Sequence, residues 1–105
     1  MSDVLLAAME RLHDAVANRR GPDVIGPLLD DVARLSAEHF ATEERVLRRY
    51  GYRQAGKRSA QHARLLRKVP NLQQDLLEGK RKGPGVTRFL YSLSQQAGYR
   101  QNWVA

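Results

Sequence analysis

Three side chains that commonly bind metals occur at helical spacing in the middle of this 105-residue sequence. His39 and Glu43 are four residues apart, so on a helix the imidazole and the carboxylate would point to the same patch. His62 falls on the inward stripe of the next predicted helix, and antiparallel packing would bring it level with the other two. Two histidines and one carboxylate suit iron, manganese or zinc. The same pattern also fits a core histidine bonded to a carbonyl group beside a half-buried His–Glu hydrogen bond.

Apolar residues recur at helical spacing along the chain, and no segment alternates as a strand would. We predict helices over 3–18, 23–50, 54–77 and 86–101, with Asp23 as the N-cap of the second. Pro70 should kink or interrupt the third, because it lacks an amide donor and clashes with the preceding turn. The predicted inward stripe of the second helix is Leu28, Val32, Leu35, His39, Glu43, Val46 and Tyr50.

Helices of this length are marginal in isolation, so the four must share one core. We therefore predict an all-α fold, an antiparallel up-down-up-down four-helix bundle, as a single domain over residues 1–105. Pro27 fits the second helix only if it lies in the first turn. The segment 79–85, which is rich in glycine and basic residues, is predicted to be an exposed loop.

Composition excludes several classes of protein. The chain has no cysteine, which excludes disulfides, thiolate zinc sites, iron–sulfur clusters and thiol nucleophiles. No apolar run reaches the ~18 residues of a membrane span, and the first residues do not read as a secretory signal, so we expect a cytoplasmic protein. No Ser–His–Asp arrangement, phosphate-binding glycine loop or catalytic carboxylate pair is visible, and we do not predict an enzyme.

Charge is distributed unevenly along the sequence. Residues 1–50 hold 7 basic and 9 acidic residues, whereas residues 51–105 hold 11 and 2. This asymmetry fits either a solvated basic face or an acidic partner, such as an acidic protein. Lys80, Arg81 and Lys82 could bind phosphate or acidic lipid. Nucleic acid is not favoured, because interleaved aromatic residues and a recognition-helix motif are both missing.

Two motifs lie where the candidate ligands occur. Residues 39–44 read His-Phe-Ala-Thr-Glu-Glu, and after Tyr-Gly-Tyr at 50–52, residues 61–66 read Gln-His-Ala-Arg-Leu-Leu. These motifs resemble the hemerythrin family, most closely its bacterial single-domain members, whose second helix ends in His-Phe-x-x-Glu-Glu and whose third carries His-x-x-x-His. Residues 12–15 resemble the Leu-Tyr-Asp-Ala turn of those proteins, so the likeness extends over nearly the whole chain.

The resemblance implies a bundle that binds two irons through five histidines, one glutamate and one aspartate, and that carries or senses O2. His39, the bridging Glu43 and His62 match ligands of the family. The ligand position on the first helix falls at or beside Ser2, and the first histidine of the third-helix pair is replaced by Arg58.

The fourth helix matches the family in one of two registers. An alignment anchored on residues 89–90 places the ligand positions at Ala97 and Asn102, and the helical stripe favours it. An alignment anchored on Trp103 places them at Gln95 and Arg100. In both registers this helix supplies no histidine and no carboxylate.

Only three of the seven ligand positions are therefore retained, which is too few to hold a di-iron centre. Arg58 also opposes it, because a cation at a ligand position repels a divalent metal. We expect Arg58 to pair with Glu43 in a bidentate ion pair, with His39 and His62 as hydrogen-bonding neighbours. Because losing the irons would leave Glu43 buried without a partner, replacing Arg58 with Met should cost ~3 kcal/mol of stability.

Three functions remain open from the sequence. The leading prediction is a hemerythrin-like module with a degenerate site and no metal, acting as a non-catalytic binding or interaction protein. The first alternative is a metal-binding oxygen or redox sensor or carrier, with one Fe or Zn ion on His39, Glu43 and His62. The second alternative is a basic adaptor that binds an acidic partner through residues 51–105.

Overall fold

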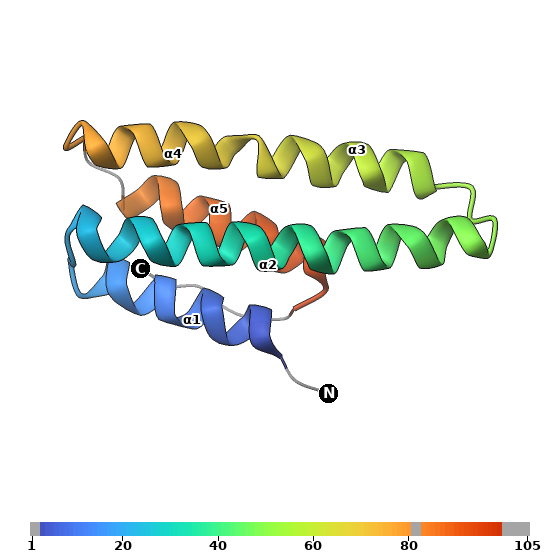
Figure 1. The fold of residues 1–105 in the computed structure, drawn as a ribbon, viewed down its shortest axis with the longest axis horizontal. Coiled ribbons are helices and arrows are strands. Elements are labelled where there is room, and N and C mark those ends of the chain that lie inside the picture. The colour runs from blue at the N-terminus through green and yellow to red at the C-terminus, as the bar shows by residue number, and fades with distance from the viewer. Residues whose placement is uncertain (1–2, 81–82, 100–105) are drawn as a thin grey trace.

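The computed structural model describes residues 3–80 and 83–99 of the chain. They form five α-helices: α1 (Val4–Ala17), α2 (Pro22–Arg49), α3 (Ala55–Leu66), α4 (Lys68–Leu77) and α5 (Gly83–Ala97). Helices α3 and α4 lie end to end, so the five helices build four rods (Figure 1). The described residues contain no strand, and the prediction of an all-α fold is confirmed for them.

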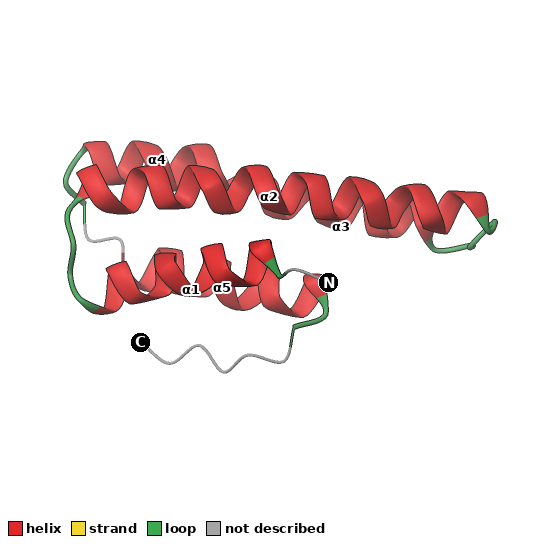
Figure 2. Ribbon diagram, turned by 60° about the horizontal axis from the view of Figure 1, so that its bottom comes forward, coloured by secondary structure: helices red, strands yellow, loops and turns green. Residues whose placement is uncertain are grey.

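The longest helix, α2, packs against each of the other helices, and so does α5. Helix α1 packs against α2 and α5 only. At the end where α2 passes into α3, these two helices extend beyond α1 and α5 (Figures 1 and 2). No helix in the described ranges is long and apolar enough to cross a membrane.

The predicted interruption by Pro70 is present, and it separates α3 from α4 at Arg67. Pro70 is the third residue of α4, within a first turn whose amide groups have no partner inside the helix. The proline therefore leaves no broken hydrogen bond within α4, and the chain continues in nearly the same direction.

The start of α2 differs from the prediction. Gly21 is the N-cap, Pro22 is the first helical residue, and Asp23 lies in the first turn instead of capping the helix. The fixed backbone angle of proline suits the first helical position, so the helix begins earlier than the predicted cap. Pro27 consequently lies inside α2, beyond its first turn, which corrects the expectation of a first-turn position.

The start of α5 is also earlier than predicted. The helix begins at Gly83, so part of the expected basic loop at 79–85 is helical. Pro84 is the second residue of the helix and suits that turn for the same reason as Pro22. Arg81, Lys82 and the predicted helical residues 100–101 lie outside the described residues.

The inward face of α2 is rotated from the predicted stripe. Val32 is buried as predicted, but Val46 and Tyr50 are exposed, Tyr50 by 79%. The end of α2 that carries these two residues extends beyond α1 and α5. The predicted burial is wrong there because an apolar stripe is buried only where a neighbouring helix covers it. The buried residues of α2 are Ile25, Leu29, Val32, Ser36 and Phe40. The hydroxyl of Ser36 donates to the carbonyl of Val32 at 2.6 Å, which satisfies this buried polar group.

Candidate functional site

A polar link joins α2 to α3 at the position of the candidate ligands. The Nε atom of Arg58 donates to Oε1 of Glu43 at 3.1 Å, and Nη2 of Arg58 donates to the same oxygen. The predicted ion pair is therefore present, but both donors share one oxygen instead of forming the two parallel bonds of a bidentate pair. The side chains of Arg58 and Glu43 are 38% and 25% exposed. The pair is half-buried, so the cost of ~3 kcal/mol expected for a buried pair does not apply.

A second polar link joins the same helices deeper in the protein. His62 is 2% exposed, and its Nδ1 atom lies 2.7 Å from Oε2 of Glu44. The ring of His62 stacks on Phe40, with the planes 4° apart and the centroids separated by 3.8 Å. Because Phe40 and Glu44 are one turn apart on α2, one side chain covers the ring while the other accepts its hydrogen bond. Glu43, Glu44, Arg58 and His62 together are called the polar cluster below.

The electrostatics of the polar cluster centre on Glu44. The hydrogen bond from His62 lowers the pKa of Glu44, while partial burial of the carboxylate opposes this shift. Ser59 and Arg48 lower the pKa of Glu44 further. The Nε2 atom of His62 is buried and has no hydrogen-bond partner within residues 3–80 and 83–99, and it lies 3.7 Å from Oε1 of Glu43. The carboxylate of Glu44 therefore lies beside Nδ1 of the imidazole, and the carboxylate of Glu43 lies nearer to Nε2.

His39 does not belong to the polar cluster. Its ring meets Phe40 edge-on at 5.9 Å between centroids and lies at an angle of 32° to the ring of Tyr99 at 6.3 Å. The hydroxyl of Tyr99 in turn donates to Asp3 at 3.5 Å. The expectation that His39 is a hydrogen-bonding neighbour of the Arg58–Glu43 pair is therefore wrong. The rotation of α2 explains this, because it places Phe40 rather than His39 against α3.

The remaining ligand positions of the resemblance contribute no histidine or carboxylate that the structure describes, and Gln95, the position in the second register, is exposed on α5. Ala97 is the last residue of α5 and is partly buried against the core. Ser2, Asn102 and, in the other register, Arg100 lie outside the described residues. Within residues 3–80 and 83–99, no group of three or more His, Cys, Asp or Glu side chains is arranged to hold a metal ion. The described residues do not fit a di-iron centre, because Glu43 is already bonded to the guanidinium of Arg58 and Glu44 to the imidazole of His62.

Glu44 is the functional candidate that sequence reasoning passed over. Glu44 is the last residue of the His-Phe-x-x-Glu-Glu motif and does not match a ligand position of the family. The useful signal was helical spacing, since Glu44 follows Phe40 by four residues and shares its face. In comparisons with known proteins, the chain matches no protein-family profile, no curated protein and no solved structure.

The Arg58–Glu43 pair should make a modest contribution to stability. Replacing Arg58 with Met should lower the free energy of unfolding by about 1 kcal/mol, since the pair is half-exposed and Glu43 can recover solvent on one side. Urea denaturation at pH 7 measures the change. Arg64→Met, which removes an exposed cation from the same helix, is the control and should change stability far less. A loss of 3 kcal/mol or more for Arg58→Met would contradict the half-buried description.

The Glu44–His62 bond should make stability depend on acid pH. The pKa of Glu44 is lower in the folded chain than in the unfolded chain, so its stabilisation is present above about pH 4.3 and lost as pH falls through the folded pKa. Glu44→Gln should therefore be less stable than wild type at pH 6, with the difference shrinking towards pH 3. Thermal unfolding across this range measures it, and Glu10→Gln is an exposed control. A difference that stays constant with pH would refute the assignment.

Proposed function

We propose that this protein is a non-catalytic interaction module built on a hemerythrin-like four-helix bundle of antiparallel up-down-up-down topology. The proposal retains the expected cytoplasmic location and assigns no O2 chemistry to the chain. Four rods around one apolar core and the likeness of residues 39–44 and 61–66 to the family support it. The polar cluster then replaces a metal centre as the polar contact between the second and third rods.

The observation that carries this proposal is the position of Arg58. The resemblance assigns this position to an iron ligand, and here its guanidinium donates twice to the carboxylate that would bridge the metals. Binding a divalent ion to Glu43 would require that pair to separate and would leave the cation beside the metal. A fixed positive charge bonded to the bridging position favours a structural role for the cluster.

The first alternative, one Fe or Zn ion on His39, Glu43 and His62, requires a rearrangement. Two observations favour keeping it under test. The Nε2 atom of His62 is buried and finds no hydrogen-bond partner in the described part of the chain, and it already lies 3.7 Å from Glu43. Against it, the ring of His39 packs on Tyr99, so the third ligand would have to leave an aromatic contact.

Metal content separates these two functions. Protein purified from iron-supplemented cells should contain far less than one metal ion per chain, because Arg58 already occupies Glu43; elemental analysis measures the ratio. Two irons per chain with the visible absorption of an oxo-bridged pair would refute the proposal. One ion per chain that is lost in His39→Ala and retained in His13→Ala would establish the alternative instead.

An exposed surface at one end of the molecule favours the adaptor function, in which the module binds an acidic partner. Where α2 and α3 extend beyond the other helices, Tyr50 and Tyr52 are 79% and 53% exposed. Arg49 and Arg53 are exposed beside them in the sequence. Tyrosine and arginine, with tryptophan, are enriched among the residues that contribute most of the binding energy in protein interfaces. We call residues 49–53 the tip and propose that it binds an acidic protein segment.

Binding by the tip can be compared directly with binding by the basic residues Lys80 and Lys82. In the tip variant, Arg49→Gln and Arg53→Gln should weaken binding of a labelled poly-glutamate peptide about tenfold, since two charge-assisted contacts are removed. Fluorescence anisotropy at rising salt measures it, and wild-type binding should weaken with salt. The matched variant, Lys80→Gln and Lys82→Gln, should bind nearly as well as wild type. If the second variant loses more affinity than the first, the tip is not the binding surface.

A further inference from the structure

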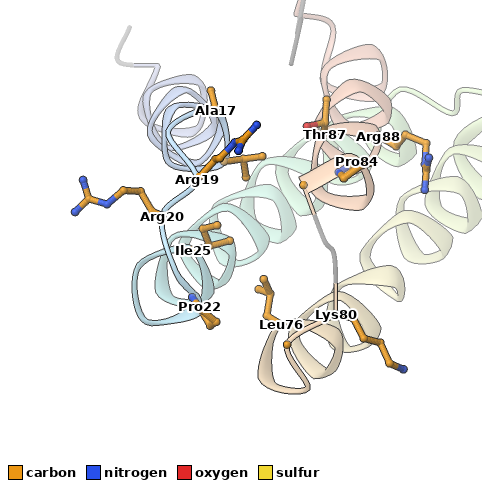
Figure 3. A pocket seen from close by; sticks show the side chains of 13 residues that line it. Ala17, Arg19, Arg20, Pro22, Ile25, Leu76, Lys80, Pro84, Thr87 and Arg88 are labelled. Carbon is orange, nitrogen blue, oxygen red and sulfur yellow. The ribbon is translucent and has the colours of Figure 1, made fainter.

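An open cavity lies at the other end of the molecule from the tip. It has a volume of about 880 Å³ and is bordered by the end of α1, the start of α2, the end of α4 and the start of α5 (Figure 3). This volume is within the range of ~300–1,000 Å³ that is typical of small-molecule sites. Ile25 and Glu43 are separated along α2 by a rise of about 27 Å, so the cavity is distinct from the polar cluster.

The inner surface of the cavity is apolar. Ile25 from α2 and Leu76 from α4 are both buried members of the hydrophobic core, and both line it. Val16, which packs against the same core, and Pro84 line it from α1 and α5. An apolar chain bound here would contact side chains that are continuous with the core, and would release water from them.

The rim of the cavity is basic. Its charged lining residues are Arg19, Arg20, Lys80 and Arg88, and no carboxylate lines it among the described residues. Lys80 already pairs with Glu78 at 2.8 Å. The other three form no ion pair within the part of the chain that the structure describes. Arg19 extends between α1 and α5, whereas Arg20 and Arg88 point outward (Figure 3).

Two further features belong to residues that line the cavity. The hydroxyl oxygen of Thr87 is buried and has no hydrogen-bond partner among the described residues. A buried hydroxyl without a partner costs stability, and a ligand oxygen would satisfy it. Arg19 itself has φ of +56°, the left-handed conformation that a non-glycine residue adopts at a cost. The chain therefore keeps an arginine at a position where glycine would be less strained.

We propose that this cavity binds a small amphipathic anion, an apolar chain that carries a single carboxylate or phosphate head. The chain would lie against Ile25 and Leu76, and the head would accept hydrogen bonds from Arg19 and Thr87. A guanidinium pairs with either head, so the shared chemistry is an anionic oxygen group on a hydrocarbon tail. This site does not depend on the function proposed for the polar cluster or the tip.

Isothermal titration of the full chain with three matched twelve-carbon probes tests the proposal. Dodecanoate and dodecyl phosphate, each below its micellar concentration, should bind with one molecule per chain, and dodecanol should bind at least about tenfold more weakly because it lacks the charge. The tighter of the two anions identifies the head group. Inorganic phosphate should bind far more weakly than dodecyl phosphate, since it has no chain to bury.

Two variants locate the site without disrupting the fold. Arg19→Gly should weaken binding about tenfold while thermal stability is retained or raised, because glycine relieves the left-handed strain. Ala17→Trp places an indole at an exposed lining residue and should block the cavity. The control Arg64→Gln removes an exposed arginine of α3 that does not line the cavity, and it should bind as wild type does.

Several results would overturn the proposal. If neither anion binds, the cavity is not a site for this class of ligand. If dodecanol binds as tightly as dodecanoate, or inorganic phosphate as tightly as dodecyl phosphate, the ligand is not an amphipathic anion. If Arg64→Gln weakens binding as much as Arg19→Gly, the anions follow net charge instead of the cavity. If Arg19→Gly proves unstable, unchanged binding in a folded Ala17→Trp variant would be enough to reject it.

Discussion

A carboxylate that leaves water must meet a cation or a hydrogen-bond donor, and the packing of α2 against α3 must meet this constraint at two consecutive positions. Glu43 meets Arg58 near the surface, and Glu44 meets His62 deeper in the interior. Both glutamates come from consecutive positions of α2, so the rotation of that helix must satisfy both at once. The stacking of Phe40 on His62 is compatible with that rotation and excludes water from one face of the imidazole.

The two ends of the molecule differ because the helices differ in length. At one end, α2 and α3 extend past α1 and α5, and Tyr50 remains exposed although it continues the helical stripe of α2. At the other end, four helix termini surround a space that their side chains do not fill. A bundle with unequal rods has a fully packed interior only where all of them overlap, so side chains at the longer end of α2 and α3 stay exposed although they follow a helical stripe.

Much of the fold could be predicted from local signals. The four helical segments, the break near Pro70 and the inward stripe of the last helix through Val86, Leu90 and Leu93 follow from helical periodicity and the chemistry of proline. The Arg58–Glu43 pair could be predicted because a charge in a bundle interior needs an opposite charge. The role of Glu44 and the separation of His39 from the cluster could not, since adjacent positions on a helix differ by 100° and the sequence does not specify the rotation to that precision.

The sequence by itself determined that this chain is helical, strongly basic in its second half and free of cysteine, because residue type and spacing are local properties. Only the tertiary structure decided which glutamate bonds to which partner, that His39 packs on Tyr99, and that the termini of four helices enclose an apolar space with a basic rim. The physical reason is that these features depend on rotations and offsets between helices. Those are set by the packing of the whole core, to which residues far apart in the sequence contribute together.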